Sequence, residues 1–205
     1  MTEVRELLLA RGAPPPLARR AELLTAALRV IRRDGPSASM DAMAAEAGIT
    51  KPILYRHFGD REGLLAAVAD LFADELIARL DTALASSDEP LERIEAAVRS
   101  YVSFIAEDPA LYGFLTKQAP VASPALVGVV DRVAATLRRA MDEAAEQAAL
   151  GGLPTETWAY GVVGMVHMAG ARWAGEPIPE RERLVADLTR LVAFGLLTVP
   201  DGAPA

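Results

Sequence analysis

One basic and aromatic stretch in the first third of the chain constrains the fold more than any other feature. Residues 47–65 read AGITKPILYRHFGDREGLL. Leu54 and Phe58 stand four residues apart, so they share one face of a helix and can be buried together. Lys51 and Tyr55 are also four apart, and they place a donor and a flat ring on the opposite face. Such a helix has one face for a core and one face suited to a groove edged by phosphates.

The residues around this helix indicate where it begins and what precedes it. Residues 40–47 carry small and apolar side chains at helical spacing, and Gly48 can end that helix and let the next one leave at a steep angle. Thr50 is a good N-cap, and Pro52 lies in the first turn, where a missing N–H costs nothing. The pattern of helix, glycine turn and short basic helix predicts a helix-turn-helix.

The same residues resemble a known family. The chain resembles the DNA-binding region of the TetR family of bacterial repressors. The similar residues are Ala44, the turn 47–50, Leu-Tyr-Arg-His-Phe at 54–58, and the run 60–65. The resemblance covers residues 17–65. It implies a three-helix DNA-binding head at 17–63, a homodimer on a palindromic operator, and a small-molecule inducer that releases the protein from DNA.

The resemblance also assigns roles on the DNA-binding face. The implied contacts to base edges are Lys51, Pro52, Ile53 and Arg56, and the implied contacts at the phosphates are Ser39, Tyr55, His57 and Arg61. Thr50 is included among the DNA-binding residues without a separate role. Ile53 stands where the family often has a hydroxyl or a small residue, so we expect it to contact a thymine methyl instead. Asp41 also departs from the family's pattern. A carboxylate at this position would repel a nearby phosphate.

Charge is distributed unevenly along the chain. The net charge of −7 argues against DNA binding at first sight. Residues 1–63, however, hold ten basic and eight acidic residues, whereas residues 64–205 hold eleven and twenty. This asymmetry permits a DNA-binding head on an acidic body, and the motif rather than the charge carries the prediction.

The rest of the chain is predicted to be helical. Residues 1–16 end in three prolines and are interpreted as a flexible arm, whose Arg5 and Arg11 either reach a minor groove or touch nothing. Asp60 can cap a long helix that ends near residue 84. The predicted helices are 19–34, 40–47, 51–58, 60–84, 90–106, 109–116, 124–150, 155–174 and 179–198, several of them opened by a proline. No strand pattern competes, so we predict an all-α fold of about nine helices, with residues 64–205 forming a ligand-binding and dimerisation domain.

Two sets of body residues are candidates for binding. Small and apolar residues at helical spacing predict a dimer interface of Gly161, Gly164, Met168, Ala171, Leu184, Leu188, Leu191 and Gly195, although the same residues could complete the core of one subunit. Aromatic and soft side chains predict an apolar effector site of Tyr101, Phe104, Tyr112, Phe114, Trp158, Met165 and His167, although each could be plain core. A lipophilic or aromatic compound is expected over a sugar or a nucleotide.

Other functional classes find little support. The chain has no cysteine, and its two histidines, His57 and His167, lack the partners of a catalytic triad or a metal site. We therefore expect no enzyme, no cofactor and no metal. The most apolar run, 161–171, is too short to span a bilayer, and the N-terminus lacks a secretory signal, so the expected location is the cytoplasm. The alternative function is a helical ligand-binding or interaction protein that never binds DNA.

Overall fold

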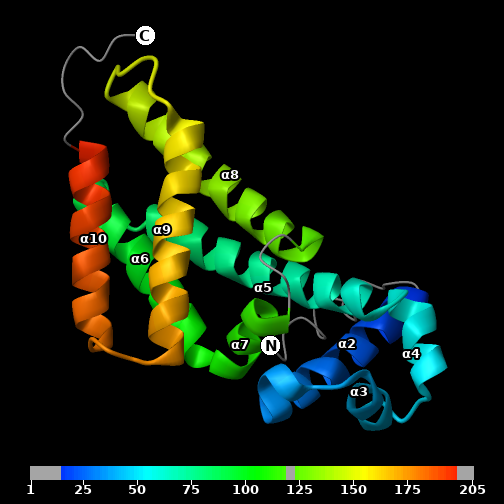
Figure 1. Cartoon of the computed structure of the whole chain (residues 1–205). Coiled ribbons are helices and arrows are strands. Elements are labelled where there is room, and N and C mark those ends of the chain that lie inside the picture. Colours follow the sequence, from blue (N-terminus) through cyan, green and yellow to red (C-terminus); the bar gives the residue numbers. More distant parts are fainter. Residues whose placement is uncertain (1–14, 119–122, 198–205) are drawn as a thin grey trace. The chain divides into compact units, whose positions relative to one another are not determined.

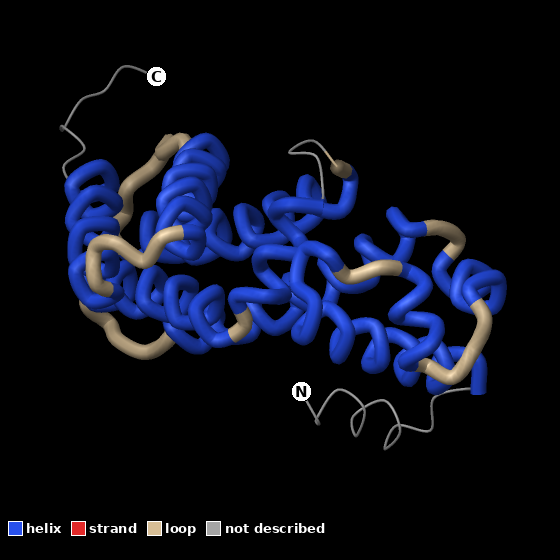
Figure 2. The backbone as a smooth tube through the Cα atoms, turned by 60° about the horizontal axis from the view of Figure 1, so that its bottom comes forward, coloured by secondary structure: helices blue, strands red, loops and turns tan. Residues whose placement is uncertain are grey.

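The computed structural model describes residues 15–118 and 123–197, and the regular structure in these ranges is entirely helical (Figure 2). In chain order the elements are α2 (Pro15–Asp34), the 3-10 turn η1 (Gly35–Ser37), α3 (Met40–Glu46), α4 (Lys51–Phe58), α5 (Arg61–Leu84), α6 (Pro90–Glu107), α7 (Pro109–Gln118), α8 (Pro124–Gln147), α9 (Thr155–Gly175) and α10 (Arg181–Leu197). The all-α prediction is confirmed.

Side-chain caps mark where two of these helices begin. Asp108 precedes α7, and its Oδ1 accepts a hydrogen bond from the backbone N–H of Leu111 at 3.1 Å. Ser123 precedes α8, and its hydroxyl accepts from the N–H of Leu126 at 3.3 Å. Each bond satisfies an N–H that has no partner inside its helix, so a short polar side chain followed by proline marks both starts correctly.

Some boundaries differ from the sequence prediction. Helix α2 begins at Pro15, inside the predicted arm, because proline is tolerated in the first turn of a helix. Thr155 is the first residue of α9 and not its N-cap, and its hydroxyl donates to Oδ1 of Asp142 at 2.6 Å. Helix α10 begins at Arg181 rather than at residue 179. Arg5 and Arg11 lie outside the described residues.

The described residues form two compact units. The first unit consists of 15–71 with 108–118 and 123–126, and the second consists of 72–107 with 127–197. Helix α5 contributes its first part to the first unit and the remainder to the second. The proposed division between head and body at residue 63 thus runs within the part of α5 that packs with the helix-turn-helix.

The first unit is built around α2, which packs against α3, η1 and α7. Its inward side chains, such as Leu23, Ala27 and Ile31, are fully buried. Helix α7 also packs on η1, where a Cβ added to Gly113 would lie 3.7 Å from the ring of Pro36. The sequence did not predict that α7 would complete the unit that contains the helix-turn-helix.

The second unit is centred on α6, which packs against both α9 and α10 (Figure 1). Val102 and Ile105 of α6 and Val185 of α10 are buried in this core. The indole N–H of Trp173, near the end of α9, donates to the carbonyl of Pro179 at 2.8 Å. This bond fixes the turn that leads from α9 into α10.

Candidate nucleic-acid interface

The turn between α3 and α4 has the backbone that a glycine favours. Gly48 adopts a φ of +65°, in the left-handed region where a Cβ is disfavoured. The N–H of Gly48 donates to the carbonyl of Ala45 and the N–H of Ile49 donates to that of Ala44, each at 3.0 Å. These two bonds form a Schellman motif that ends α3 and redirects the chain into α4. Thr50 holds the N-cap position with an extended backbone, but its side chain makes no capping bond.

Helix α4 is anchored through its apolar face. Leu54 is fully buried and Phe58 is 6% exposed, as their spacing predicts. Arg20 of α2 lies with its guanidinium carbon 4.8 Å from the centre of the Phe58 ring, a cation–π contact that sequence reasoning missed. Because the anchor residues point inward, the opposite side of α4 remains outward.

The junction between α4 and α5 depends on a glycine whose role the sequence did not reveal. A Cβ added to Gly63 would lie 1.9 Å from the backbone oxygen of Phe58. The N–H of Gly63 donates to Oδ1 of Asp60 at 2.7 Å, which confirms Asp60 as the cap of α5. Only a residue without a side chain allows α5 to start this close to the end of α4, so Gly63 sets the position of α4 relative to α5.

The predicted DNA-contacting residues lie on and beside the outward side of α4. Pro52, Arg56, Thr50, Ser39 and Arg61 are exposed, and Lys51, Ile53, Tyr55 and His57 are half-buried. The hydroxyl of Ser39 accepts from the N–H of Ala42 at 3.2 Å and so caps α3. All nine positions are brought together within the first unit, and their individual DNA contacts stay predictions.

Lys51 has a partner that the sequence did not predict. Its Nζ donates to Oδ2 of Asp41 at 2.9 Å. This hydrogen bond and the attraction of the carboxylate raise the pKa of Lys51. Asp41 belongs to the first turn of α3, so the ion pair links the two helices of the helix-turn-helix across the face expected to meet DNA. The two residues are ten apart in the chain and lie on different helices, so spacing within a helix could not predict the pair.

The seven predicted effector-site residues are not gathered in one unit. Tyr112 and Phe114 belong to α7 in the first unit, where both are buried. Tyr101, Phe104, Trp158, Met165 and His167 belong to the second unit. The assignment of all seven to one internal site therefore mixes two packing environments, because an apolar face on a short helix does not reveal which neighbour covers it.

Within the second unit, Tyr101 and His167 face each other. The Tyr101 hydroxyl and Nδ1 of His167 are 3.4 Å apart, and burial lowers the pKa of His167. A Cβ added to Gly170 would lie 2.7 Å from the Tyr101 ring, so this glycine makes room for the tyrosine between α6 and α9. Phe104 packs against Phe72 with the ring centres 4.8 Å apart and the ring planes tilted by 46°, which gives it a structural role.

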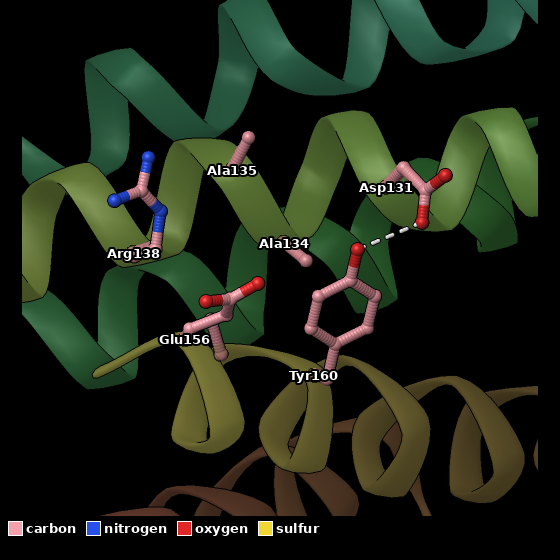
Figure 3. A pocket seen from close by; sticks show the side chains of 7 residues that line it. Asp131, Ala134, Ala135, Arg138, Glu156 and Tyr160 are labelled. Carbon is pink, nitrogen blue, oxygen red and sulfur yellow. Dashed lines mark hydrogen bonds between the residues drawn. The ribbon is translucent and has the colours of Figure 1, made fainter. Parts of the chain in front are cut away.

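A hollow of about 160 Å³ lies between α8 and α9 (Figure 3). It is lined by Asp131, Ala134, Ala135, Arg138, Glu156, Ala159 and Tyr160. The Tyr160 hydroxyl donates to Oδ1 of Asp131 at 2.8 Å, and this bond raises the pKa of Tyr160. None of the predicted effector residues lines this hollow, whose walls combine alanines with charged side chains and a tyrosine.

The predicted dimer-interface residues divide by burial. Leu184 and Leu188 are 8% and 5% exposed, because this side of α10 carries buried core residues of the second unit. They have almost no surface left for a partner, so we remove them from the interface. The other six positions, Gly161, Gly164, Met168, Ala171, Leu191 and Gly195, are exposed or half-buried. Helical spacing identified the apolar positions of α10 but not which of its sides faces the core.

The described residues offer no site for metal chemistry. No group of three or more histidine, aspartate or glutamate side chains in 15–118 and 123–197 is arranged to hold a metal ion. In the same part of the chain, no helix combines the length and the apolar character needed to cross a membrane.

Models of known protein families match both the helix-turn-helix region and most of the remainder of the chain. The family model described as "Bacterial regulatory proteins, tetR family" matches residues 23–68, and that described as "Tetracyclin repressor-like, C-terminal domain" matches 79–205. An uncharacterized HTH-type transcriptional regulator of Mycobacterium tuberculosis is 34% identical over 179 residues, which are 84% of this chain and 75% of the relative. The HTH-type transcriptional activator FasR of Mycolicibacterium smegmatis is 34% identical over 113 residues, which are 55% of this chain and 52% of that protein.

A solved structure is similar along most of the chain. The TetR-like transcriptional regulator from Rhodococcus sp. RHA1 is 26% identical, with a TM-score of 0.63, and the match covers 91% of this chain and 100% of that one. The helix-turn-helix geometry, the two family models and these relatives agree with each other. The chain belongs to the TetR family of bacterial transcriptional regulators, which are not enzymes, and its helix-turn-helix is a DNA-binding element.

Proposed function

We propose that this TetR-family regulator represses transcription by binding a palindromic operator as a homodimer, and that a mostly apolar small molecule releases it. The observation that carries the proposal is the outward side of α4, where Lys51, Pro52 and Arg56 lie at the surface while Leu54 and Phe58 anchor the helix. A helix presented in this way can enter a major groove with its polar side chains toward base edges.

Exposed apolar side chains on α9 and α10 support the homodimer. Met168 is 67% exposed on α9, and Leu191 and Phe194 are 55% and 73% exposed on α10. Both helices pack on α6, and these three side chains are not among the buried residues. A Cβ added to Gly164 or Gly161 would meet nothing within 4 Å, so a neighbouring helix could approach α9 closely. We call Met168, Leu191, Phe194 and these glycines the α9–α10 apolar face, and a second copy of the chain is the occupant we propose for it.

A symmetric dimer implies a symmetric operator. Two copies related by a two-fold axis present two α4 helices, which must enter successive major grooves on one side of the DNA. The half-sites are then about 34 to 36 Å apart, one turn of B-DNA. The operator is therefore expected to be a palindrome, and the protein is expected to act in the cytoplasm, where bacterial DNA lies.

The effector proposal rests on the second unit. Tyr101, His167 and Trp158 place aromatic surface and polar tips on α6 and α9. We propose that they hold a lipophilic or aromatic compound, with Tyr101 or His167 bound to its polar end. Release from DNA then requires that the compound bind the non-DNA geometry more tightly, by about 1.4 kcal/mol for a tenfold loss of operator affinity.

The direction of regulation has a specific alternative. The M. smegmatis relative is named an activator. Repression and activation are separated by transcription from an operator-bearing promoter in vitro, with and without the protein. A fall in transcript on adding the protein supports repression, whereas a rise shows activation.

The proposal is tested by selecting bound sequences from a pool of random duplexes with the full-length protein. Enrichment of a palindrome supports operator binding, and enrichment of no sequence favours the alternative of a helical ligand-binding or interaction protein. Candidate lipophilic compounds are then titrated while fluorescence anisotropy follows operator release. Trp158→Ala should change the response to the compound while leaving binding without it largely intact. An unchanged response in a folded, dimeric variant would remove Trp158 from the effector site.

A further inference from the structure

The ion pair between α3 and α4 lies on the side of the helix-turn-helix that we propose meets DNA. Asp41 stands in the first turn of α3, and Lys51 is the first residue of α4. The Asp41 side chain is 73% exposed and the Lys51 side chain is 39% exposed. An exposed carboxylate at this place weakens attraction to phosphates, so it calls for an explanation other than general affinity for DNA.

The bonding capacity of the pair extends beyond the pair itself. The ammonium group of Lys51 has three donors, and the bond to Asp41 at 2.9 Å uses one of them. An ionised carboxylate has about four acceptor positions, and this bond uses one at Oδ2. The pair therefore presents donors and acceptors side by side at a fixed spacing.

This spacing matches the edge of a base pair. In the major groove, guanine offers O6 and N7 as acceptors, and cytosine offers one N–H of its N4 amino group as a donor. O6 and N4 are hydrogen-bonded to each other, so they lie about 2.9 Å apart, as do Nζ of Lys51 and Oδ2 of Asp41. We propose that Asp41 and Lys51 together read one G·C base pair, with Lys51 over the guanine and Asp41 over the cytosine amino group. This inference rests on the proposed binding of a specific operator by α4.

An A·T pair fits the same two side chains less well. Over thymine, Lys51 finds the single acceptor O4 beside an apolar methyl group, so one ammonium donor is left without a partner. Over adenine, Asp41 accepts from N6 but lies beside the acceptor N7, which repels the carboxylate. With G·C, the three Lys51 donors are used by Asp41, O6 and N7. This count of donors and acceptors favours G·C over A·T.

The test uses the sequence selected by the wild-type protein and duplexes modified at single atoms. N4-methylcytosine keeps the hydrogen that pairs with guanine but replaces the exposed amino hydrogen by a methyl group, so it removes the atom assigned to Asp41. Replacing guanine by 7-deazaguanine removes the N7 acceptor assigned to Lys51. At the G·C position concerned, each modification should weaken the wild-type complex roughly 5- to 100-fold in fluorescence anisotropy.

The variants assign these losses to the two residues. Asp41→Ala should bind the N4-methylcytosine and unmodified duplexes within about twofold of each other, and Lys51→Ala should be equally insensitive to 7-deazaguanine. Glu22→Ala changes the net charge as Asp41→Ala does, and Glu22 pairs with Arg19 on α2 at 2.7 Å. This control should keep the full wild-type sensitivity to both modifications. Circular dichroism verifies that every variant is folded.

Distinct results overturn the inference. If Asp41→Ala tightens binding to all duplexes alike and stays sensitive to N4-methylcytosine, Asp41 only screens charge. If the position that responds to Asp41→Ala requires A·T, the pair reads the other base pair. In both cases a sequence has been selected, so operator binding stands while the G·C assignment fails. If the wild-type protein selects no sequence, operator binding and this inference fail together.

Discussion

Arg32 of α2 donates through Nε to Oδ2 of Asp108 at 2.7 Å, while Oδ1 of the same aspartate caps α7 at the N–H of Leu111. One carboxylate thus begins α7 and ties it to the helix that forms the core of the first unit. The Asp108 side chain is 23% exposed, so the ion pair is only partly screened by water. Removal of this side chain should break both contacts.

Asp108→Ala should lower the free energy of unfolding by about 1 to 2 kcal/mol, of which a lost cap accounts for about 1 and a half-exposed ion pair for the rest. Urea denaturation at fixed protein concentration measures the change. Asp88→Ala is the control, because Asp88 is fully exposed and lies 3.8 Å from Arg93. Equal stability of the two variants would show that the contacts of Asp108 contribute nothing measurable.

Leu191→Glu should yield monomers and severely weaken operator binding, because a carboxylate would have to be desolvated in the α9–α10 apolar face. Each subunit should stay folded, since Leu191 is 55% exposed. Leu188→Ala should instead destabilise the fold by about 2 to 5 kcal/mol, as expected for a truncated core leucine. Light scattering and thermal unfolding separate these outcomes. A Leu191→Glu protein that remains dimeric and binds the operator normally would place the interface elsewhere.

Arg61→Ala should weaken binding to every DNA sequence to a similar degree and reduce the slope of log affinity against log salt concentration by about 1. The reason is that a phosphate contact releases counterions but reads no base. Lys51→Ala should instead relax the preference at one base pair by about 1 to 3 kcal/mol. Anisotropy titrations on operator and random DNA at several salt concentrations provide the measurement. Identical effects of the two changes on both DNAs would contradict the division of roles.

Gly63→Ala should destabilise the protein by about 1 to 3 kcal/mol or more and weaken operator binding, because the new Cβ meets the backbone oxygen of Phe58 and α4 must move. Gly128→Ala on α8 is the matched control, since a Cβ there meets nothing within 4 Å. That control should be neutral or stabilising by up to about 1 kcal/mol. Thermal unfolding and operator titration compare the two, and a neutral Gly63→Ala would refute the proposed close packing of α4 and α5.

The pKa of His167 is lowered in the folded protein because burial disfavours the charged ring. The unfolded chain therefore binds a proton at His167 more readily than the folded protein does. His167 costs no stability well above its unfolded pKa of 6.5, and it destabilises the fold as the pH falls below that value. His167→Phe should lose less stability than the wild type between about pH 7.5 and about pH 5.5. Urea unfolding at both pH values tests this, and parallel losses in the two proteins would show that His167 titrates normally.

The helices themselves could be predicted from the sequence because their ends are marked locally. Pro90, Pro109 and Pro124 open helices where expected, and Asp60 caps α5 through a neighbour three residues away. Leu54 and Phe58 are buried because their spacing places them on one face of α4. Such signals depend on residues within one or two turns, so no tertiary information is needed to find them.

The partners of these helices could not be predicted in the same way. The packing of α7 on α2 and η1 could not be predicted, because an apolar side of a short helix fits many neighbours. The pair Asp41–Lys51 bridges two helices at a separation without periodicity. The role of Gly63 arises from the backbone oxygen of Phe58 rather than from any side chain. These features depend on how the chain folds back on itself, which local patterns do not encode.

The packing of α7 against α2 bears on whether the DNA-binding part of this protein can be transplanted. A fragment that ends at residue 71 would leave out 108–118 and 123–126, the part of the first unit that is distant in the chain. In a hybrid that joins residues 15–71 to another regulator's body, η1 and α2 would meet a foreign helix in place of α7. Arg32 would then lose Asp108, and Pro36 would lose its close neighbour Gly113. A hybrid with altered operator choice should therefore carry both parts of the first unit, because they pack together although they are far apart in the chain.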